Sequence, residues 1–319
     1  MNAVVHICLM LLMPPLLLGV INRVKAKFAG RRGQPLLQAY YDLIKLARKG
    51  LVLSRTTTWV FRAGPVVSLV AVMLAGLVVP LGPFNAPISF TGDLILFAYL
   101  FGLARFFTTS AALDTGSAFE GMGAAREVTF ACLAEPALFL AFLALAKLAS
   151  GLPVIAGVAA PTPLSLTTMM HAPWVGPLAK LPVAAIVLVA IGLFIVLLAE
   201  NCRIPVDDPN THLELTMIHE VMVLDHSGPL FGIVLYGAAM KLFVLSALVG
   251  HVLAPYHVDV PGVGGLVLNW IIFVGEMLGV AVVVGVVESV MARLQMRHVP
   301  MLLVAACLLC GLGFLMVLR

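Results

Sequence analysis

The chain has 319 residues, of which 62% are apolar and 11% charged. Ordinary soluble domains carry roughly 25% charged residues, and the mean hydropathy here is +1.10. A chain of this length with so few charges lacks the polar surface that a soluble protein needs, so we expect an all-α integral membrane protein. The net charge of +4 is small, so no nucleic-acid partner is indicated.

Runs of about 20 apolar residues, the length that crosses a bilayer core about 30 Å thick, recur along the whole chain. They predict eight membrane-spanning helices at about 3–22, 66–83, 94–113, 128–150, 181–200, 230–253, 266–290 and 300–318. We therefore expect a single multi-span membrane domain covering residues 1–319. Within the segment 23–65, residues 36–47 place apolar side chains at helical spacing, which predicts an amphipathic helix at the membrane interface.

Basic residues are distributed unevenly between the two sides of the predicted bundle. Of the 19 Lys and Arg residues, fourteen lie in loops on one side, ten of these in segment 23–65, and three lie on the other. Because Lys- and Arg-rich loops remain in the cytoplasm, segments 23–65 and 200–228 are expected to face inward. We therefore expect a multi-pass protein of the cell inner membrane with both termini outside.

Several ionisable residues fall inside the predicted spans, among them Arg105, Glu135, Lys241 and Glu276. A charge at a helix centre costs about 2.5–3.5 kcal/mol on insertion scales, so it normally faces a partner or a wet cavity. Acids and basic groups at similar depth are typical of proton or ion pathways. The alternative is a set of structural ion pairs between helices.

The segment 200–228 is unusually acidic for a loop on the basic side. It holds six acids against Arg203, and apolar residues lie between them, which indicates partial burial. Buried carboxyl groups close to one another favour proton binding. The candidate proton-pathway residues of the whole chain are Arg105, Glu135, Glu200, Asp207, Asp208, Glu214, Glu220, Asp225, Lys241 and Glu276.

Motifs for a cofactor or a catalytic centre are not found. Cys307 and Cys310 form a C-x-x-C pair, but they lie within an apolar span and no second ligand pair accompanies them. We expect them to act as small apolar side chains. The sequence contains no P-loop, dinucleotide fingerprint or H-E-x-x-H motif, so neither a catalytic residue nor a metal ligand is predicted.

Four blocks carry a family resemblance: RRGQPLLQAYYDLIKL (31–46), GSAFEGMGAAREVTFACLAEP (116–136), AENCRIPVDDP (199–209) and LDHSG (224–228). They resemble the membrane subunit shared by respiratory complex I, where it is subunit 1 or the H subunit, and the energy-converting NiFe hydrogenases. His226 stands where the family usually has tyrosine. The stretches FEGMGAAREV and VDDPNTHLELTMIHE are similar to formate hydrogenlyase sequences.

The resemblance implies a membrane anchor and proton-pathway subunit of a formate hydrogenlyase-like complex. Such a subunit binds no cofactor itself, because other subunits carry the NiFe centre and the iron–sulfur clusters. The implied partners are hydrogenase-like large and small subunits, a ferredoxin-like iron–sulfur subunit, antiporter-like membrane subunits and the lipid bilayer. The residues assigned to structure and to docking of the peripheral arm are Gln38, Asp42, Lys45, Arg126, Arg203 and Pro205.

Two alternatives stay open at the level of sequence. One is the quinone-site subunit of a respiratory complex I, an NADH:quinone oxidoreductase, in which a quinone would bind near segment 23–65. The other is a stand-alone secondary ion transporter, although no internal repeat is visible in the sequence. The sequence does not decide whether protons or sodium ions move.

Overall fold

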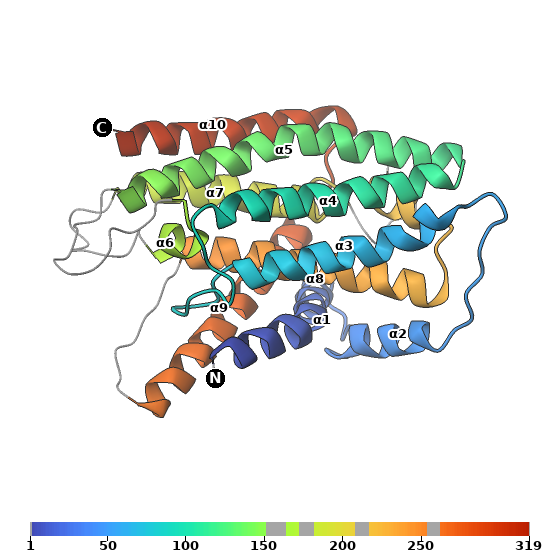
Figure 1. Ribbon diagram of the computed structural model, residues 1–319, viewed down its shortest axis with the longest axis horizontal. Helices are drawn as coiled ribbons and strands as arrows, with labels where there is room; N and C mark the ends of the chain where they lie inside the picture. The colour runs from blue at the N-terminus through green and yellow to red at the C-terminus, as the bar shows by residue number, and fades with distance from the viewer. Residues whose placement is uncertain (1, 151–163, 172–181, 208–216, 254–261, 319) are drawn as a thin grey trace.

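The computed structural model describes residues 2–150, 164–171, 182–207, 217–253 and 262–318 (Figure 1). Regular structure within these ranges is helical, apart from an isolated bridge between Leu81 and Phe84. The elements are α1 (Asn2–Phe28), α2 (Gln38–Ala47), α3 (Trp59–Val78), α4 (Asp93–Asp114), α5 (Ala118–Ser150), α6 (Leu166–His171), α7 (Val183–Glu200), η3 (Glu220–Val223), α8 (Gly228–Leu253), α9 (Val263–Val290), η4 (Met296–His298) and α10 (Val299–Leu318).

Eight helices among the described residues are long and apolar enough to cross a membrane: α1, α3, α4, α5, α7, α8, α9 and η4 with α10. The prediction of an all-α integral membrane protein is therefore confirmed. Several helices begin earlier than the apolar runs suggest. α5 starts at Ala118 rather than near 128, and α3 at Trp59 rather than 66. A helix need not stop at the edge of the bilayer core, and hydropathy detects the apolar part alone.

The helices pack as a layered bundle. Figure 1 shows α10, α5, α4 and α3 side by side in that order, and each neighbouring pair is in contact. Behind this layer, α7 contacts α5, α8 and α10, while α8 also contacts α1 and α3. α9 packs mainly on α1 and is inclined to the other helices in this view. Helices α4, α5, α7 and α8 thus enclose a common interior.

The amphipathic helix expected within 36–47 is present as α2. It packs against α8 and α1, and the hydroxyl of Tyr40 donates a hydrogen bond to the carbonyl of Leu12. Tyr41 and Ile44 on its other face are exposed. An apolar exposed face beside basic residues suits the boundary between lipid and water.

Small residues allow the long helices to approach closely, as is usual in membrane bundles. A Cβ at Gly64 of α3 would lie 2.5 Å from the Cβ of Ala111 on α4. A Cβ at Gly192 of α7 would lie 2.3 Å from the Sγ of Cys310 and 3.2 Å from the carbonyl oxygen of Ala306, both on α10. The C-x-x-C cysteine Cys310 is thus a packing residue, buried against α7.

We predict that Gly192→Ala destabilises the protein by about 1–3 kcal/mol, because an extra methyl group overpacks the α7–α10 interface. Adding Cys310→Ala should restore part of the loss, since it removes the nearer of the two contacts. Gly279→Ala in α9 is the control, because a Cβ there meets nothing within 4 Å. Thermal unfolding in detergent measures the effect, and equal stability of the Gly192→Ala and Gly279→Ala variants would contradict this packing.

Candidate functional site

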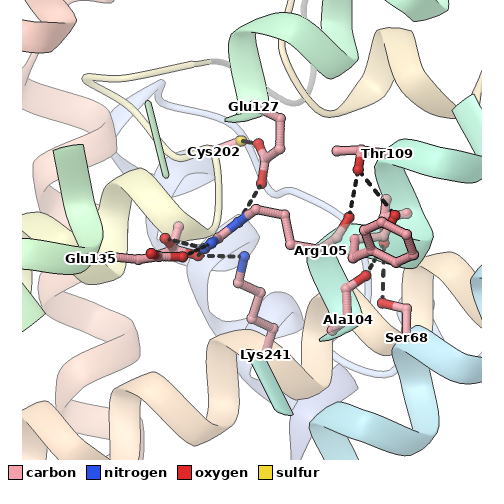
Figure 2. Close-up of polar contacts among 11 residues, drawn as sticks. Ser68, Ala104, Arg105, Thr109, Glu127, Glu135, Cys202 and Lys241 are labelled. Carbon is pink, nitrogen blue, oxygen red and sulfur yellow. Dashed lines mark hydrogen bonds and ion pairs between the residues drawn. The ribbon is translucent and has the colours of Figure 1, made fainter. Parts of the chain in front are cut away.

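Arg105 is the centre of a charged cluster between α4, α5, α7 and α8 (Figure 2). Its Nη2 donates to both carboxylate oxygens of Glu200, at 2.7 and 2.9 Å. Its Nη1 pairs with the carboxylate of Glu135, and its Nε lies 3.9 Å from Oε1 of Glu127. One guanidinium group therefore contacts three carboxylates from two different helices.

Lys241 of α8 supplies the second cation. Its Nζ lies 2.7 Å from Oε2 of Glu200, so Glu200 is held between two basic groups. The side chain of Glu200 is 7% exposed, and that of Arg105 is 11% exposed. Buried charges are tolerated when they are paired and hydrogen-bonded, and the fork of arginine suits a two-oxygen contact with a carboxylate.

The charges of this cluster do not balance. Counted over the described residues, Glu127, Glu135 and Glu200 face Arg105 and Lys241. Three carboxylates against two cations leave one negative charge in excess if every group is ionised. At membrane depth such an excess is costly. A proton bound to one carboxyl group, or a further cation beside it, would remove the excess.

A cavity of about 80 Å³ adjoins the cluster and is lined by Glu127, Glu200, Lys241 and His219, among others. A water molecule needs about 10–15 Å³ of such space and two to four polar partners, so the cavity has room for several. A second cavity of about 320 Å³ lies between α1, α2 and α8. Asn201 and His219 line both cavities. The two cavities are therefore separated by a single layer of residues that includes these two.

Two histidines beside these cavities are neutral near pH 7. Burial is the largest influence on His219 and lowers its pKa, against a smaller opposing effect of Glu220. Burial likewise lowers the pKa of His226 to about 4. The His226 ring is stacked on Phe61 with ring centroids 4.1 Å apart.

The segment after α7 is anchored to the rest of the bundle by ion pairs. Arg293 lies 2.7 Å from Asp207, whose other oxygen accepts the backbone N–H of Ile218 at 2.8 Å. Nη1 of Arg203 lies 3.3 Å from Oε1 of Glu288 on α9. Nζ of Lys25 on α1 lies 2.8 Å from Oε2 of the same carboxylate. These pairs fix the segment on which Asn201 and His219 lie.

The structure brings together some of the predicted pathway residues. Arg105, Glu135, Glu200 and Lys241 form the cluster, and Glu220 lines the second cavity. The others lie elsewhere. Asp207 is in an ion pair, and the backbone N–H of Asp225 donates to Glu120. Glu276 lies on α9 beside Gly250, about 14 Å along α8 from Lys241. Asp208 and Glu214 are outside the described residues.

The residues assigned to docking fall into two groups. Gln38, Asp42 and Lys45 lie on α2, where Gln38 donates to Asp42 at 2.9 Å, and Asp42 lines the second cavity. Arg126 lies on α5, and Arg203 and Pro205 lie in the segment after α7. Arg126 donates to the carbonyl of Met217 at 2.9 Å, and the carbonyl of Pro205 accepts the N–H of Leu294. This second group holds the protein's own loops in place.

Sequence reasoning missed Glu127. Glu127 lies one residue before the predicted span 128–150, whereas α5 begins at Ala118 and carries Glu127 into the cluster. The sequence feature that points to Glu127 is its spacing. It is an acidic residue eight positions before Glu135, on the same helix as Arg126. Glu288, with its partners Lys25 and Arg203, was also not assigned a role.

We predict that Arg105→Met lowers stability by about 3–5 kcal/mol, the usual effect of removing one partner from buried ion pairs. The substitution leaves three carboxylates around Lys241. Adding Glu135→Gln removes one of them, so the double variant should be more stable than Arg105→Met alone. Thermal unfolding of the purified variants measures both effects. Wild-type stability of Arg105→Met would show that the cluster does not hold the helices together.

Comparison with known proteins places the chain among membrane subunits of redox complexes. Formate hydrogenlyase subunit 4 of Escherichia coli K12 is 34% identical over 289 residues, which cover 90% of this chain and 88% of that protein. Hydrogenase-4 component C of the same organism is 29% identical over 304 residues, or 94% and 91% of the two chains. A chain in the structure of an archaeal respiratory membrane complex, the membrane-bound sulfane sulfur reductase, has the same fold.

That structural match has a TM-score of 0.79 at 20% identity and covers 99% of this chain and 98% of the other. The family model described as NADH dehydrogenase matches residues 1–319. The sequence resemblance to this group of membrane subunits is confirmed by these matches. The chain belongs to the NADH dehydrogenase family.

Proposed function

We propose that this chain is the membrane anchor and proton-pathway subunit of a formate hydrogenlyase-like redox complex. The observation that carries the proposal is the unbalanced cluster of Arg105, Lys241 and three glutamates beside a cavity that has room for water. One carboxyl group of such a cluster can bind and release a proton while the other charges remain paired. The similarity to formate hydrogenlyase subunit 4 supports the type of complex.

In this proposal the redox chemistry takes place in other subunits. A peripheral arm with the NiFe centre and iron–sulfur clusters docks on the side of α2 and of the loop after α7, and antiporter-like membrane subunits lie beside the bundle. Within the described residues, no group of three His, Cys, Asp or Glu side chains is placed to hold a metal ion. We assign the complex to the cell inner membrane, with both termini outside, on the distribution of basic residues.

The proton route begins on the cytoplasmic side. It enters the cavity between α1, α2 and α8, passes Asn201 and His219, and reaches Glu200 and Glu127 in the cluster. From there Arg105 and its carboxylate partners bridge α7 and α5, so the route continues to Glu135. The neutral ring of His219 has one nitrogen that accepts a proton and one that donates, which suits its place between the two cavities.

A second candidate is the quinone-site subunit of a complex I. The cavity of about 320 Å³ favours it, because Pro15, Leu18 and Leu43 give it apolar walls while Asp42 and Arg203 give it polar contacts. A quinone headgroup needs that combination. The two candidates share the charged cluster and differ in whether the cavity binds a quinone during turnover.

The composition of the isolated assembly decides between these candidates. We expect that a tag on this chain isolates further subunits together with nickel and iron, and that the preparation evolves or oxidises hydrogen. NADH oxidation with quinone reduction, and no nickel, would identify a complex I instead. A chain that is isolated alone and transports ions without partners would be a secondary transporter.

We predict that Glu135→Gln leaves the assembly intact but lowers proton translocation by about 100-fold or more, the size of effect typical when a proton-transfer group is removed. Glu120→Gln is the matched control on the same helix. Glu120 is buried and accepts the N–H of Asp225, and glutamine retains an acceptor oxygen. Proton uptake per electron pair in proteoliposomes measures both, and wild-type coupling in Glu135→Gln would remove Glu135 from the route.

A further inference from the structure

A groove of about 640 Å³ opens on the outer face of α4 and α5 and leads inward to the charged cluster. Its rim is apolar and aromatic. Tyr99 is 74% exposed, Phe106 63% and Phe139 43%. Its inner end is formed by Arg105, Glu135 and Glu200. We call this feature the α4–α5 groove. It joins an exposed apolar surface to buried charges.

Glu135 is the exposed member of the cluster. Its side chain is 45% exposed, compared with 11% for Arg105 and 7% for Glu200. The exposure is directed into the α4–α5 groove, because Glu135 lines it. Just over half of the Glu135 side chain is therefore covered by the protein, and the rest is open to whatever occupies the groove.

The depth of the opening restricts the occupant. Arg105 lies twelve residues after the start of α4 and nine before its end, so it is about 18 Å and 14 Å from the two ends of the helix. Lipid headgroups lie near the ends of such helices, and acyl chains offer no hydrogen bond to a carboxylate. A polar group at this depth is normally carried by a protein helix.

The net charge of the cluster indicates which kind of side chain the occupant carries. The cluster carries one carboxylate more than its described cations balance. We propose that a membrane-spanning helix of another subunit docks in the α4–α5 groove and places a lysine, arginine or histidine against Glu135. The inference rests on the proposed function, because it requires that the chain works within a complex.

This docking would complete the cluster in two ways. The aromatic rim would pack against the incoming helix and exclude lipid from the charges. The incoming cation would balance the third carboxylate, so that the cluster is neutral with all three glutamates ionised. Proton exchange at Glu135 would then be linked to the position of the partner helix, because withdrawal of the cation favours protonation of the carboxylate.

The test is photo-cross-linking within the intact assembly isolated through this chain. A photoreactive phenylalanine analogue is placed at Tyr99 or at Phe139, where the native side chains are aromatic and exposed. The control position is Leu308 of α10, which is 63% exposed on another helix. We expect both groove positions to label one membrane helix of the same subunit, within two turns of a basic residue, and Leu308 not to label that helix.

Three results would overturn the inference: cross-links from both groove positions to lipid alone, cross-links to a helix without a nearby basic residue, or labelling of the same helix from Leu308. A double-mutant cycle then tests the ion pair. Glu135→Gln and neutralisation of the identified base should each lower the thermal stability of the assembly, and the double variant should lose less than the sum. Strict additivity would contradict the pair. If no other subunit co-purifies with the chain, the proposed function fails first.

Discussion

The contact of Glu200 with Arg105 and Lys241 is the interaction on which the interior of this protein depends. Glu200 is the last residue of α7, where the negative end of the helix dipole adds to its own charge. Two cations from α4 and α8 offset both. Three helices are thereby tied at one point, and Arg105 extends the contact to Glu135 and Glu127 on α5. The contacts that stabilise the arrangement of these helices are therefore the same contacts that form the proposed proton site.

The described residues between α7 and α8, 201–207 and 217–227, pack beside this interior. Asp207 pairs with Arg293 and accepts the backbone N–H of Ile218. Farther along the chain, the backbone N–H of Asp225 donates to Glu120, and the hydroxyl of Ser227 donates to the backbone carbonyl of Val52. Between these anchors His219 lies against both cavities. In the proposed function, a peripheral arm docks on this part of the chain. It acts on the proton route through the short segment around His219 that these contacts fix in place.

Much of the fold was predictable, because hydropathy reports the length of each apolar run directly. The costly charges were predictable for a related reason: Arg105, Glu135 and Lys241 stand out within apolar spans. Their mutual contacts were not, since they join helices far apart in sequence and depend on how each helix is rotated. Glu127 was missed because α5 extends past its apolar run. Glu276 is the opposite case. It is an ionisable residue at membrane depth that the sequence points out, but it packs beside Gly250 and away from the cluster.

In the proposed function, the cluster of three glutamates and two cations exchanges a proton during turnover. Redox-induced infrared difference spectra of the isolated assembly test this claim directly, because a protonated carboxyl group has its own C=O stretching band. We expect such a band in the wild-type protein and its loss or shift in Glu127→Gln or Glu135→Gln. Identical difference spectra in the wild-type protein and both variants would contradict it.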